Sequence, residues 1–480
     1  MLLLELPLGI VIDFSFWSTI LSLPSAERIS AIFAIIGWTI LALIFFFMGA
    51  ELWVTVRQGI YTSTWKWITL AVDVPSDTVQ SPKAVEQIFA QFSGAFAGPN
   101  LGEKYWQGAK QRWFSFEIIS IEGYIQFLIV TESKFRDLVE AAIYAQYPMA
   151  EITEVEDYVA AIPDKYPSAT HNMFGVEFGL AAEDPYPLRT YEEFEHTVSK
   201  DVMFTDPMAA ILENFTRIGP GENLWLQIII EPVSGQWKAK GIDMVKNSLQ
   251  DKGRKLVKKI VENKKPAGKE FFLSKVVTVV AEELLNAIRP PVEAPIKKKE
   301  EAPTGKMSDL TPGLRDTVAA IEEKISKIGF KTKLRAVYAA TNEVFNPSRC
   351  LEGLIGSLSQ FTFPERNGIV PKDFTSTHYA FKNYRLAEKK KLFISAYKKR
   401  KIKTGKNPYI LNIEELATVW HFPLPLVKTP LLQKTGGKRA EPPINLPIEE
   451  MVESPLKKKS LGPLSEEEKP PEPPPELRYG

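Results

Sequence analysis

The chain has 480 residues, which is enough for two or three domains of ordinary size. Its 59 Lys and Arg residues balance 58 Asp and Glu residues, and the net charge of +1 argues against a protein that coats nucleic acid over its whole surface. The single cysteine, Cys350, excludes an intrachain disulfide and a cysteine-based zinc site, and the four histidines are too widely spaced for a metal-binding pair on one helix. We therefore expect neither a metal site nor a cofactor.

An uncharged apolar stretch covers residues 29–50. A helix of this length measures about 33 Å, close to the ~30 Å hydrocarbon core of a bilayer. We therefore predict a single-pass protein of the cell membrane, with the lipid bilayer as a partner. More basic residues follow the stretch than precede it, and this asymmetry predicts that the soluble domains lie in the cytoplasm.

A second apolar stretch, residues 8–23, precedes this helix and contains the acidic residue Asp13. It is too short and too polar to span a bilayer. We predict instead an amphipathic helix that lies in the membrane interface and ends before Pro24. Residues 1–28 would then form an interfacial N-terminal segment.

Residues 61–160 contain apolar runs of strand length and two stretches with apolar residues at helical spacing. Ser81 and Ser133 each stand where they can cap a helix, and Glu122 and Gly123 form a short turn between two strands. The predicted strands cover 65–74, 112–121, 124–131 and 151–159. The order strand–helix–strand–strand–helix–strand predicts a first ferredoxin-like domain with the split βαβ plan.

Residues 170–422 contain a second series of such elements, and we predict a second ferredoxin-like domain within an α+β fold. Along residues 330–338, apolar residues alternate with Lys331, Lys333 and Arg335, which predicts a strand with one buried face and one face in solvent. A helical insertion and a Pro-, Lys- and Glu-rich linker, together residues 238–310, interrupt the domain. The other predicted elements are strands at 174–180 and 223–230 and helices at 207–217, 314–328, 343–358 and 412–420.

The last segment, residues 423–480, is rich in proline and carries runs of opposite charge at 457–459 and 466–468. It has too little apolar surface to offset the conformational entropy that ordering would remove. We predict that this tail is extended and disordered.

Motifs that indicate catalysis are missing from the sequence. It contains neither a phosphate-binding GxxxxGK[ST] loop nor a GxSxG nucleophile motif. Glu154, Glu156 and Asp157 are close in sequence, but carboxylates on a predicted strand usually form a solvated face. We therefore assign no catalytic residue and expect a protein that is not an enzyme.

The densest positive charge lies at 382–406, where basic residues are interleaved with Phe381, Tyr384, Phe393 and Tyr397. Three interpretations are open. The segment binds nucleic-acid phosphates and stacks bases on its rings, it binds acidic lipid headgroups, or it is a solvated face whose rings point into the core. The residues of the hypothetical phosphate site are Lys389, Lys390, Lys391, Lys398, Lys399, Arg400, Lys401 and Lys403.

Six segments of the chain share their pattern with one known family. They are SPKAVEQIF at 81–89, the hairpin with FEI at 116–118 and YIQFLIV at 124–130, EAAIYAQYP at 140–148, EVEDY at 154–158, NIEELATVWHFP at 412–423 and KRAEPPINLP at 438–447. In these segments the chain resembles the membrane-anchored N-terminal region of coupling ATPases of conjugation and type IV secretion-like systems, found in uncultured small-genome bacteria. In that family a hexameric DNA-pumping ATPase domain usually follows, whereas this sequence ends about 30 residues after the last segment.

The resemblance implies a non-enzymatic, membrane-anchored subunit of a DNA-transfer or type IV secretion-like apparatus. A separate hexameric-type P-loop ATPase would be its partner, because the family's ATP-binding residues have no counterparts here. DNA binding and self-association remain open. The alternative is a membrane-tethered adaptor that binds protein or anionic lipid and has no role with DNA.

Overall fold

The chain divides into two compact units. The first contains Met1–Trp65 and Ala97–Gln111, and the second contains Lys66–Phe96 and Arg112–Gly480. Most of the predicted insertion and linker, and the predicted tail from residue 425 onward, lie outside the described residues. The computed structural model describes residues 3–6, 10–13, 20, 22–75, 78, 80–198, 201–204, 206–247, 312–377 and 381–424.

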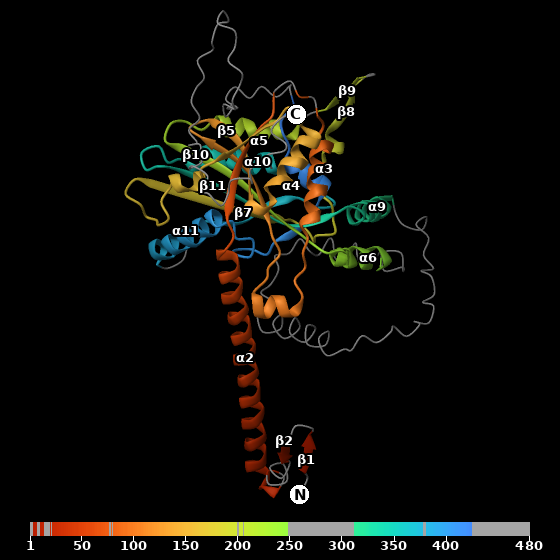
Figure 1. The fold of residues 1–480 in the computed structure, drawn as a ribbon, viewed down its shortest axis with the longest axis vertical. Coiled ribbons are helices and arrows are strands. Elements are labelled where there is room, and N and C mark those ends of the chain that lie inside the picture. The colour runs from red at the N-terminus through yellow and green to blue at the C-terminus, as the bar shows by residue number, and fades with distance from the viewer. Residues whose placement is uncertain are drawn as a thin grey trace, which may run out of the picture. The chain divides into compact units, whose positions relative to one another are not determined.

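The first unit is built on the helix α2, Ser25–Ser63, which has 39 residues (Figure 1). It is long and apolar enough to cross a membrane, and it includes the whole uncharged stretch 29–50. Large side chains such as Phe33, Trp38 and Phe46 are exposed along it. A helix with this composition has no polar face to turn toward water.

The residues before α2 differ from the predicted interfacial helix. Leu3–Leu6 form the strand β1 and Ile10–Asp13 form the strand β2, and the two strands pair antiparallel. The prediction of a helix is therefore wrong for residues 10–13. Ile10, Val11 and Ile12 all have β-branched side chains, and such side chains favour an extended backbone over a helix.

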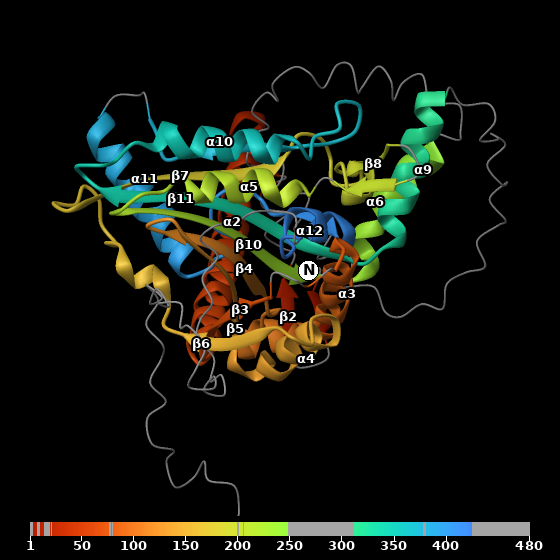
Figure 2. The same ribbon diagram turned by 90° about the horizontal axis from the view of Figure 1, so that it is seen from above.

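The second unit contains a nine-stranded sheet in the order β12-β7-β11-β10-β4-β5-β3-β6, with β13 paired to β11 (Figures 1 and 2). All neighbouring strands in it are antiparallel. The helices and this sheet make a mixed α+β fold, as expected. The strands are β3 Trp67–Asp73, β4 Phe114–Ile121, β5 Tyr124–Glu132, β6 Glu151–Val155, β7 His171–Leu180, β10 Glu222–Pro232, β11 Gly329–Thr341, β12 Ile369–Phe374 and β13 Tyr409–Asn412.

The two halves of the sheet follow the same path. The chain runs through β3, α3, β4, β5, α4 and β6 in the first half, and through β7, α5, β10, β11, α10 and β12 in the second. In each half the first strand lies between the third and the fourth, and the second strand lies at the edge. These two edges, β4 and β10, pair with each other and join the halves. The helices are α3 Pro82–Phe92, α4 Arg136–Gln146, α5 Pro207–Thr216 and α10 Pro347–Ser359.

Local sequence signals explain most helix starts and turns. Asp206 caps α5 by accepting a hydrogen bond from the Met208 backbone N–H at 2.8 Å. Ser81 stands before α3 as predicted, but its side chain makes no cap hydrogen bond. Glu122 and Gly123 both have positive φ, at 55° and 95°, which is the geometry of the tight turn expected between β4 and β5.

Some elements extend beyond the predicted set. β12, β13 and the small hairpin of β8, Glu195–Val198, and β9, Asp201–Phe204, have no counterpart in it. Between β10 and β11, the described residues include α6, Lys238–Asn247, and α9, Pro312–Ser326. These two helices pack on each other through Val245, Val318 and Ile321, which are buried with Tyr186.

The two faces of the sheet are covered by different elements (Figure 2). α3, α4, α5, α10 and α12, Ile413–Val419, cover one face with a large apolar core that includes Phe89, Phe116 and Trp420. α11, Lys382–Lys398, and the short helix Tyr158–Ala161 cover the other face. There Trp225 of β10 packs against a ring from each of these two helices.

Coverage of both faces overturns one expectation about the strand at 330–338. Two of its three basic residues do not meet water, because Lys333 and Arg335 are each only 1% exposed, whereas Lys331 is exposed as predicted. The chain after α11 covers them: Lys333 donates to the Lys406 carbonyl, and Arg335 donates to the Thr404 carbonyl at 2.5 Å. The alternation of apolar and basic residues assigned the side chains to the correct faces of the strand. It could not reveal that a later segment of the chain covers Lys333 and Arg335.

Candidate functional site

The predicted basic segment forms α11 and the loop after it. The helix ends in a Schellman motif, in which the Arg400 N–H donates to the Tyr397 carbonyl and the Lys401 N–H donates to the Ala396 carbonyl, both at 2.9 Å. Arg400 holds the left-handed position of this motif, with φ 47°, although glycine is the usual occupant. The Arg400 side chain is only 5% exposed, so the turn directs it into the protein.

A buried cluster on the sheet holds the Arg400 side chain. Its guanidinium donates to Glu117 of β4 at 2.9 and 3.1 Å and to Asp157 at 2.7 and 2.9 Å. Burial alone would lower the pKa of Arg400, but the two carboxylates outweigh burial and raise it above its usual value. Glu117 also accepts from Tyr158 at 2.8 Å and from Gln227 at 2.9 Å. Arg400 is therefore a structural cation and is not accessible to a phosphate.

Three lysines of the predicted phosphate site also have partners within the protein. Lys390 is buried and donates to Asn172 Oδ1 at 2.6 Å, and this burial lowers the pKa of Lys390. Lys389 pairs with Asp373 at 2.7 Å. Lys398 donates to a carboxylate and a carbonyl in the loop before β7, both at 2.5 Å. These contacts attach α11 to the sheet.

The remaining four predicted residues are exposed, and we call them the exposed lysines: Lys391, Lys399, Lys401 and Lys403. Lys391 lies on α11 and pairs with Glu388 of the same helix at 3.3 Å. A pair of this kind at the surface contributes little stability. Half of the predicted site is therefore accessible to an anionic partner.

The interleaved aromatic residues divide in the same way. Phe381 and Tyr384, at the start of α11, are 82% and 72% exposed. Phe393 packs against the buried side chains around Trp225, and Tyr397 is completely buried and stacks on Trp225. The exposed rings could stack on bases, whereas the buried ones cannot. The interpretation that the rings point into the core therefore holds for Phe393 and Tyr397 but not for Phe381 and Tyr384.

A second buried ionic cluster was missed by sequence reasoning. Glu177 of β7 lies 2.9 Å from Lys333 Nζ and 3.4 Å from Arg335 Nε, and it accepts from the Lys406 N–H at 2.5 Å. Gly405 has φ 92°, and a Cβ there would lie 2.2 Å from the Glu177 carboxylate. Burial and the adjacent Arg335 charge lower the pKa of Lys333. The alternating cations of β11 were the available signal, but they had been expected to face solvent.

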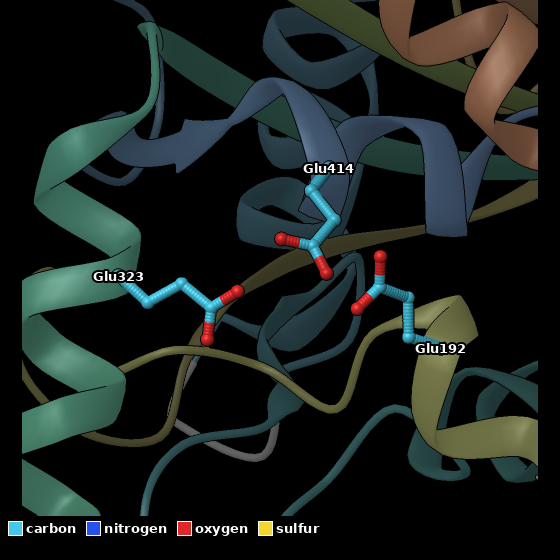
Figure 3. Close-up of side chains that lie close together, drawn as sticks. All are labelled: Glu192, Glu323 and Glu414. Atoms are coloured by element: carbon cyan, nitrogen blue, oxygen red, sulfur yellow. The ribbon is translucent and has the colours of Figure 1, made fainter.

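An acidic cluster lies elsewhere in the second unit. Carboxylate oxygens of Glu192, Glu323 and Glu414 lie within 4.8 Å of one another (Figure 3). Lys327 pairs with Glu323 at 3.3 Å and also with Glu414. Burial, together with the nearby Glu414 charge, raises the pKa of Glu192. Because a lysine already supplies positive charge here, the cluster by itself does not indicate a metal site.

Comparison with known proteins gives the chain a family. The family model described as Domain of unknown function (DUF8128) matches residues 102–434. This match covers more than half of the chain, which therefore belongs to the DUF8128 family. A comparison with curated proteins finds no match. The matched range includes the whole basic segment and extends from before β4 to beyond α12.

Proposed function

We propose that this chain is a non-enzymatic, membrane-anchored subunit of a DNA-transfer or type IV secretion-like apparatus. The observation that carries the proposal is the presence, in one chain, of a helix of membrane-spanning length and a separate helix with exposed cations and exposed aromatic rings. In this proposal α2 holds the protein in the cell membrane as a single span. The second unit lies in the cytoplasm and contacts DNA through α11.

The path of the sheet supports a finer assignment of the fold. Each half has the order strand–helix–strand–strand–helix–strand, with the second strand at its edge. We propose that these halves are two ferredoxin-like domains joined edge to edge, and that the second carries the insertion between β10 and β11. We also propose that the Pro-rich residues 423–480 form an extended tail.

Exposed charge and exposed aromatic surface are the two properties that a single-stranded nucleic acid requires. Phosphates need cations along the backbone, and bases need flat apolar faces on which to stack. Lys399, Lys401 and Lys403 lie in the loop after α11. Phe381 and Tyr384 lie at the start of the helix. Four of the eight predicted cations are used inside the protein, so the proposed contact involves few phosphates. Binding is therefore weak, and its salt dependence corresponds to only a few phosphates.

The decisive experiment measures DNA binding by the full chain in detergent or lipid. A variant with all four exposed lysines changed to Gln is compared with a matched control, in which Lys83, Lys134, Lys165 and Lys246 are changed to Gln. All four control lysines are exposed and lie outside α11 and its loop. We expect the affinity to fall linearly with salt on a log–log plot, with a slope near −0.7 per phosphate contacted on single strands.

The two variants lose the same positive charge, so comparing them separates a contact at α11 from a general effect of net charge. The α11 variant should have a flatter slope, whereas the control should keep the wild-type slope. Equal slopes in all three proteins would contradict the contact through α11, and no binding at low salt would contradict the DNA role. Binding to anionic vesicles under conditions where DNA does not bind would instead favour the membrane-tethered adaptor.

The partner motor is a separate part of the proposal. We propose that a hexameric-type P-loop ATPase works with this chain as a distinct polypeptide. The support is the resemblance of the segments at 412–423 and 438–447 to those that precede a motor in coupling ATPases. Co-purification of the tagged full chain from its native membranes should recover a P-loop ATPase, and its absence from repeated purifications would contradict this part.

A further inference from the structure

The segment Ala97–Gln111 of the first unit is fastened to α2. The indole Nε1 of Trp53 donates to the Tyr105 carbonyl at 2.8 Å, and Arg57 Nε donates to the Trp106 carbonyl at 2.7 Å. The Trp53 and Trp106 rings also meet edge to face, with centroids 6.4 Å apart. The short helix Glu103–Gln107 thereby lies beside the helix α2, just past the uncharged stretch.

A glycine makes this close approach feasible. Gly108 ends the short helix in a left-handed conformation, with φ 74°. A Cβ at this position would lie 2.3 Å from the Arg57 backbone carbonyl, which no side chain can occupy. The segment is therefore built to contact the backbone of α2 directly.

The fastened segment exposes large apolar side chains. Leu101 is 64% exposed and Trp106 is 72% exposed, and on α2 itself Leu52 and Val56 are 65% and 51% exposed. Basic side chains lie among them: Arg57 is stacked over Trp53, and Lys104 over Tyr105. Tryptophan and tyrosine are enriched at membrane interfaces, where their rings lie at the level of the headgroups. Lysine and arginine near them bind lipid phosphates.

The position along α2 agrees with that composition. Trp53 is three residues past Ala50, the end of the uncharged stretch, which places it about 4.5 Å beyond the hydrocarbon core. Arg57 lies about 10 Å beyond the same point. The polar layer on each side of a bilayer is roughly 5–8 Å thick, so this stretch of α2 crosses it.

We propose that the segment 97–111, held on Trp53 and Arg57, is a second membrane contact that lies in the lipid headgroup layer and inserts Leu101 and Trp106 at its boundary with the hydrocarbon. This inference rests on the proposed anchoring by α2 and adds to it. A single helix fixes only a depth in the bilayer, whereas a helix with a lateral contact also resists tilt and rotation. In the sequence, β3 and α3 precede the segment and β4 follows it. Both strands belong to the sheet of the second unit.

The test uses the full chain in vesicles and labels one residue at a time with an environment-sensitive fluorophore. Leu101→Cys reports the proposed contact, Leu41→Cys reports the centre of α2, and Lys83→Cys is a control in the exposed part of α3. The native Cys350 is completely buried, so the unmodified chain measures background labelling. Lipids carrying a nitroxide quencher either at the headgroup or deep in the acyl chain then report depth.

We expect the Leu101→Cys label to lose fluorescence to headgroup quencher and less to deep quencher. The Leu41→Cys label should lose it mainly to deep quencher, and the Lys83→Cys label to neither. Deep quenching at Leu41 with none at Leu101 would overturn the second contact and leave the anchor intact. No quenching at either position would overturn the anchor and the second contact together.

A double variant provides an independent check in the same vesicles. Leu101→Ser combined with Trp106→Ser removes the apolar side chains but keeps the backbone contacts with Trp53 and Arg57. With the label at Glu103→Cys, quenching by headgroup nitroxide should fall relative to the parent. An unchanged value would overturn the inserted role of these two side chains.

Discussion

The two faces of the nine-stranded sheet are both buried, yet different interactions stabilise them. On one face five helices enclose an apolar core, in which Trp420 contacts the rings of Phe89, Phe116, Phe127 and Phe422. On the other face two carboxylates of the sheet, each under 5% exposed, are met by cations. We call these the apolar face and the ionic face.

The cause of the difference lies in the covering helices. α3 carries a stripe of buried apolar residues, including Val85, Ile88 and Phe92, so it can bury one side against the sheet. α11 is too rich in lysine to form such a stripe, and it buries Lys390 together with Ile394 and Tyr397. Its contact with the sheet therefore depends on pairing charges rather than on apolar area alone.

The comparison teaches how each face specifies its geometry. Apolar contacts are non-directional, so a core keeps most of its stability when side chains shift slightly. A buried charge without its partner is strongly destabilising, so Glu117 and Glu177 each accept only an arrangement that brings a cation to them. We infer that the ionic face sets the position of α11 and its loop, and that the apolar face supplies most of the stability.

The largest expected effect is on the apolar face. Trp420→Ala removes a ring that is 1% exposed and leaves a cavity among four other rings. We expect the free energy of unfolding to fall by about 4–5 kcal/mol. Chemical denaturation of the full chain in detergent measures it, with Phe381→Ala, at an 82% exposed position, as the control. A loss below about 1.5 kcal/mol would show that this core is loosely packed.

The next effect, on the ionic face, tests whether charge pairing rather than packing matters there. Arg400→Met leaves the Glu117 carboxylate buried without its cation, and we expect a loss of about 3–4 kcal/mol. Glu117→Gln combined with Arg400→Met removes both charges, and this double variant should be more stable than the single one. If the double variant loses as much as the two single variants added together, packing rather than pairing determines stability on this face.

A third prediction concerns an ionisable pair on the apolar face. Asp206 caps α5 and lies 2.9 Å from His421 Nε2. Burial alone would raise the pKa of Asp206, but hydrogen bonds from His421, Leu424 and Met208 outweigh it and lower the pKa below its usual value. A lowered folded-state pKa means that this stabilisation is complete above the unfolded value of about 3.9 and is lost as pH falls through the folded value.

The variant Asp206→Asn removes that titration. We expect its free energy of unfolding to change less than that of the wild type when pH is lowered from about 5 to about 2. Denaturation curves at several pH values measure the difference. Asp137→Asn, at an exposed position of α4, is the control and should keep the wild-type pH dependence. Parallel curves for wild type and Asp206→Asn would contradict the prediction.

The smallest effect distinguishes the outer side of α11 from its buried side. Changing the four exposed lysines to Gln should alter the free energy of unfolding by less than about 0.5 kcal/mol, because surface charges contribute little to stability. Changing Lys390 alone to Gln should cost more, because its ammonium is buried on Asn172. If the quadruple variant is the less stable of the two, the division of α11 into a structural side and a free side is wrong.

The sequence alone determined those features that depend on neighbours along the chain. The uncharged stretch 29–50 lies within α2, and the paired strands around Glu122 and Gly123 are found as expected. Periodicity located most strands and helices to within a few residues, because burial of one face imposes a regular spacing of apolar side chains. It also distinguished the two faces of β11 correctly.

Only the tertiary structure decided which charges are available. Arg400 and Lys399 are adjacent in a run of basic residues, yet one is buried between Glu117 and Asp157 and the other is exposed. Arg400 adopts the left-handed conformation at the end of α11, and its side chain enters the protein, whereas that of Lys399 stays at the surface. The carboxylates that accept Arg400 precede it by more than 240 residues. A local pattern cannot show such a pairing, because the partner is brought there by the fold of the sheet.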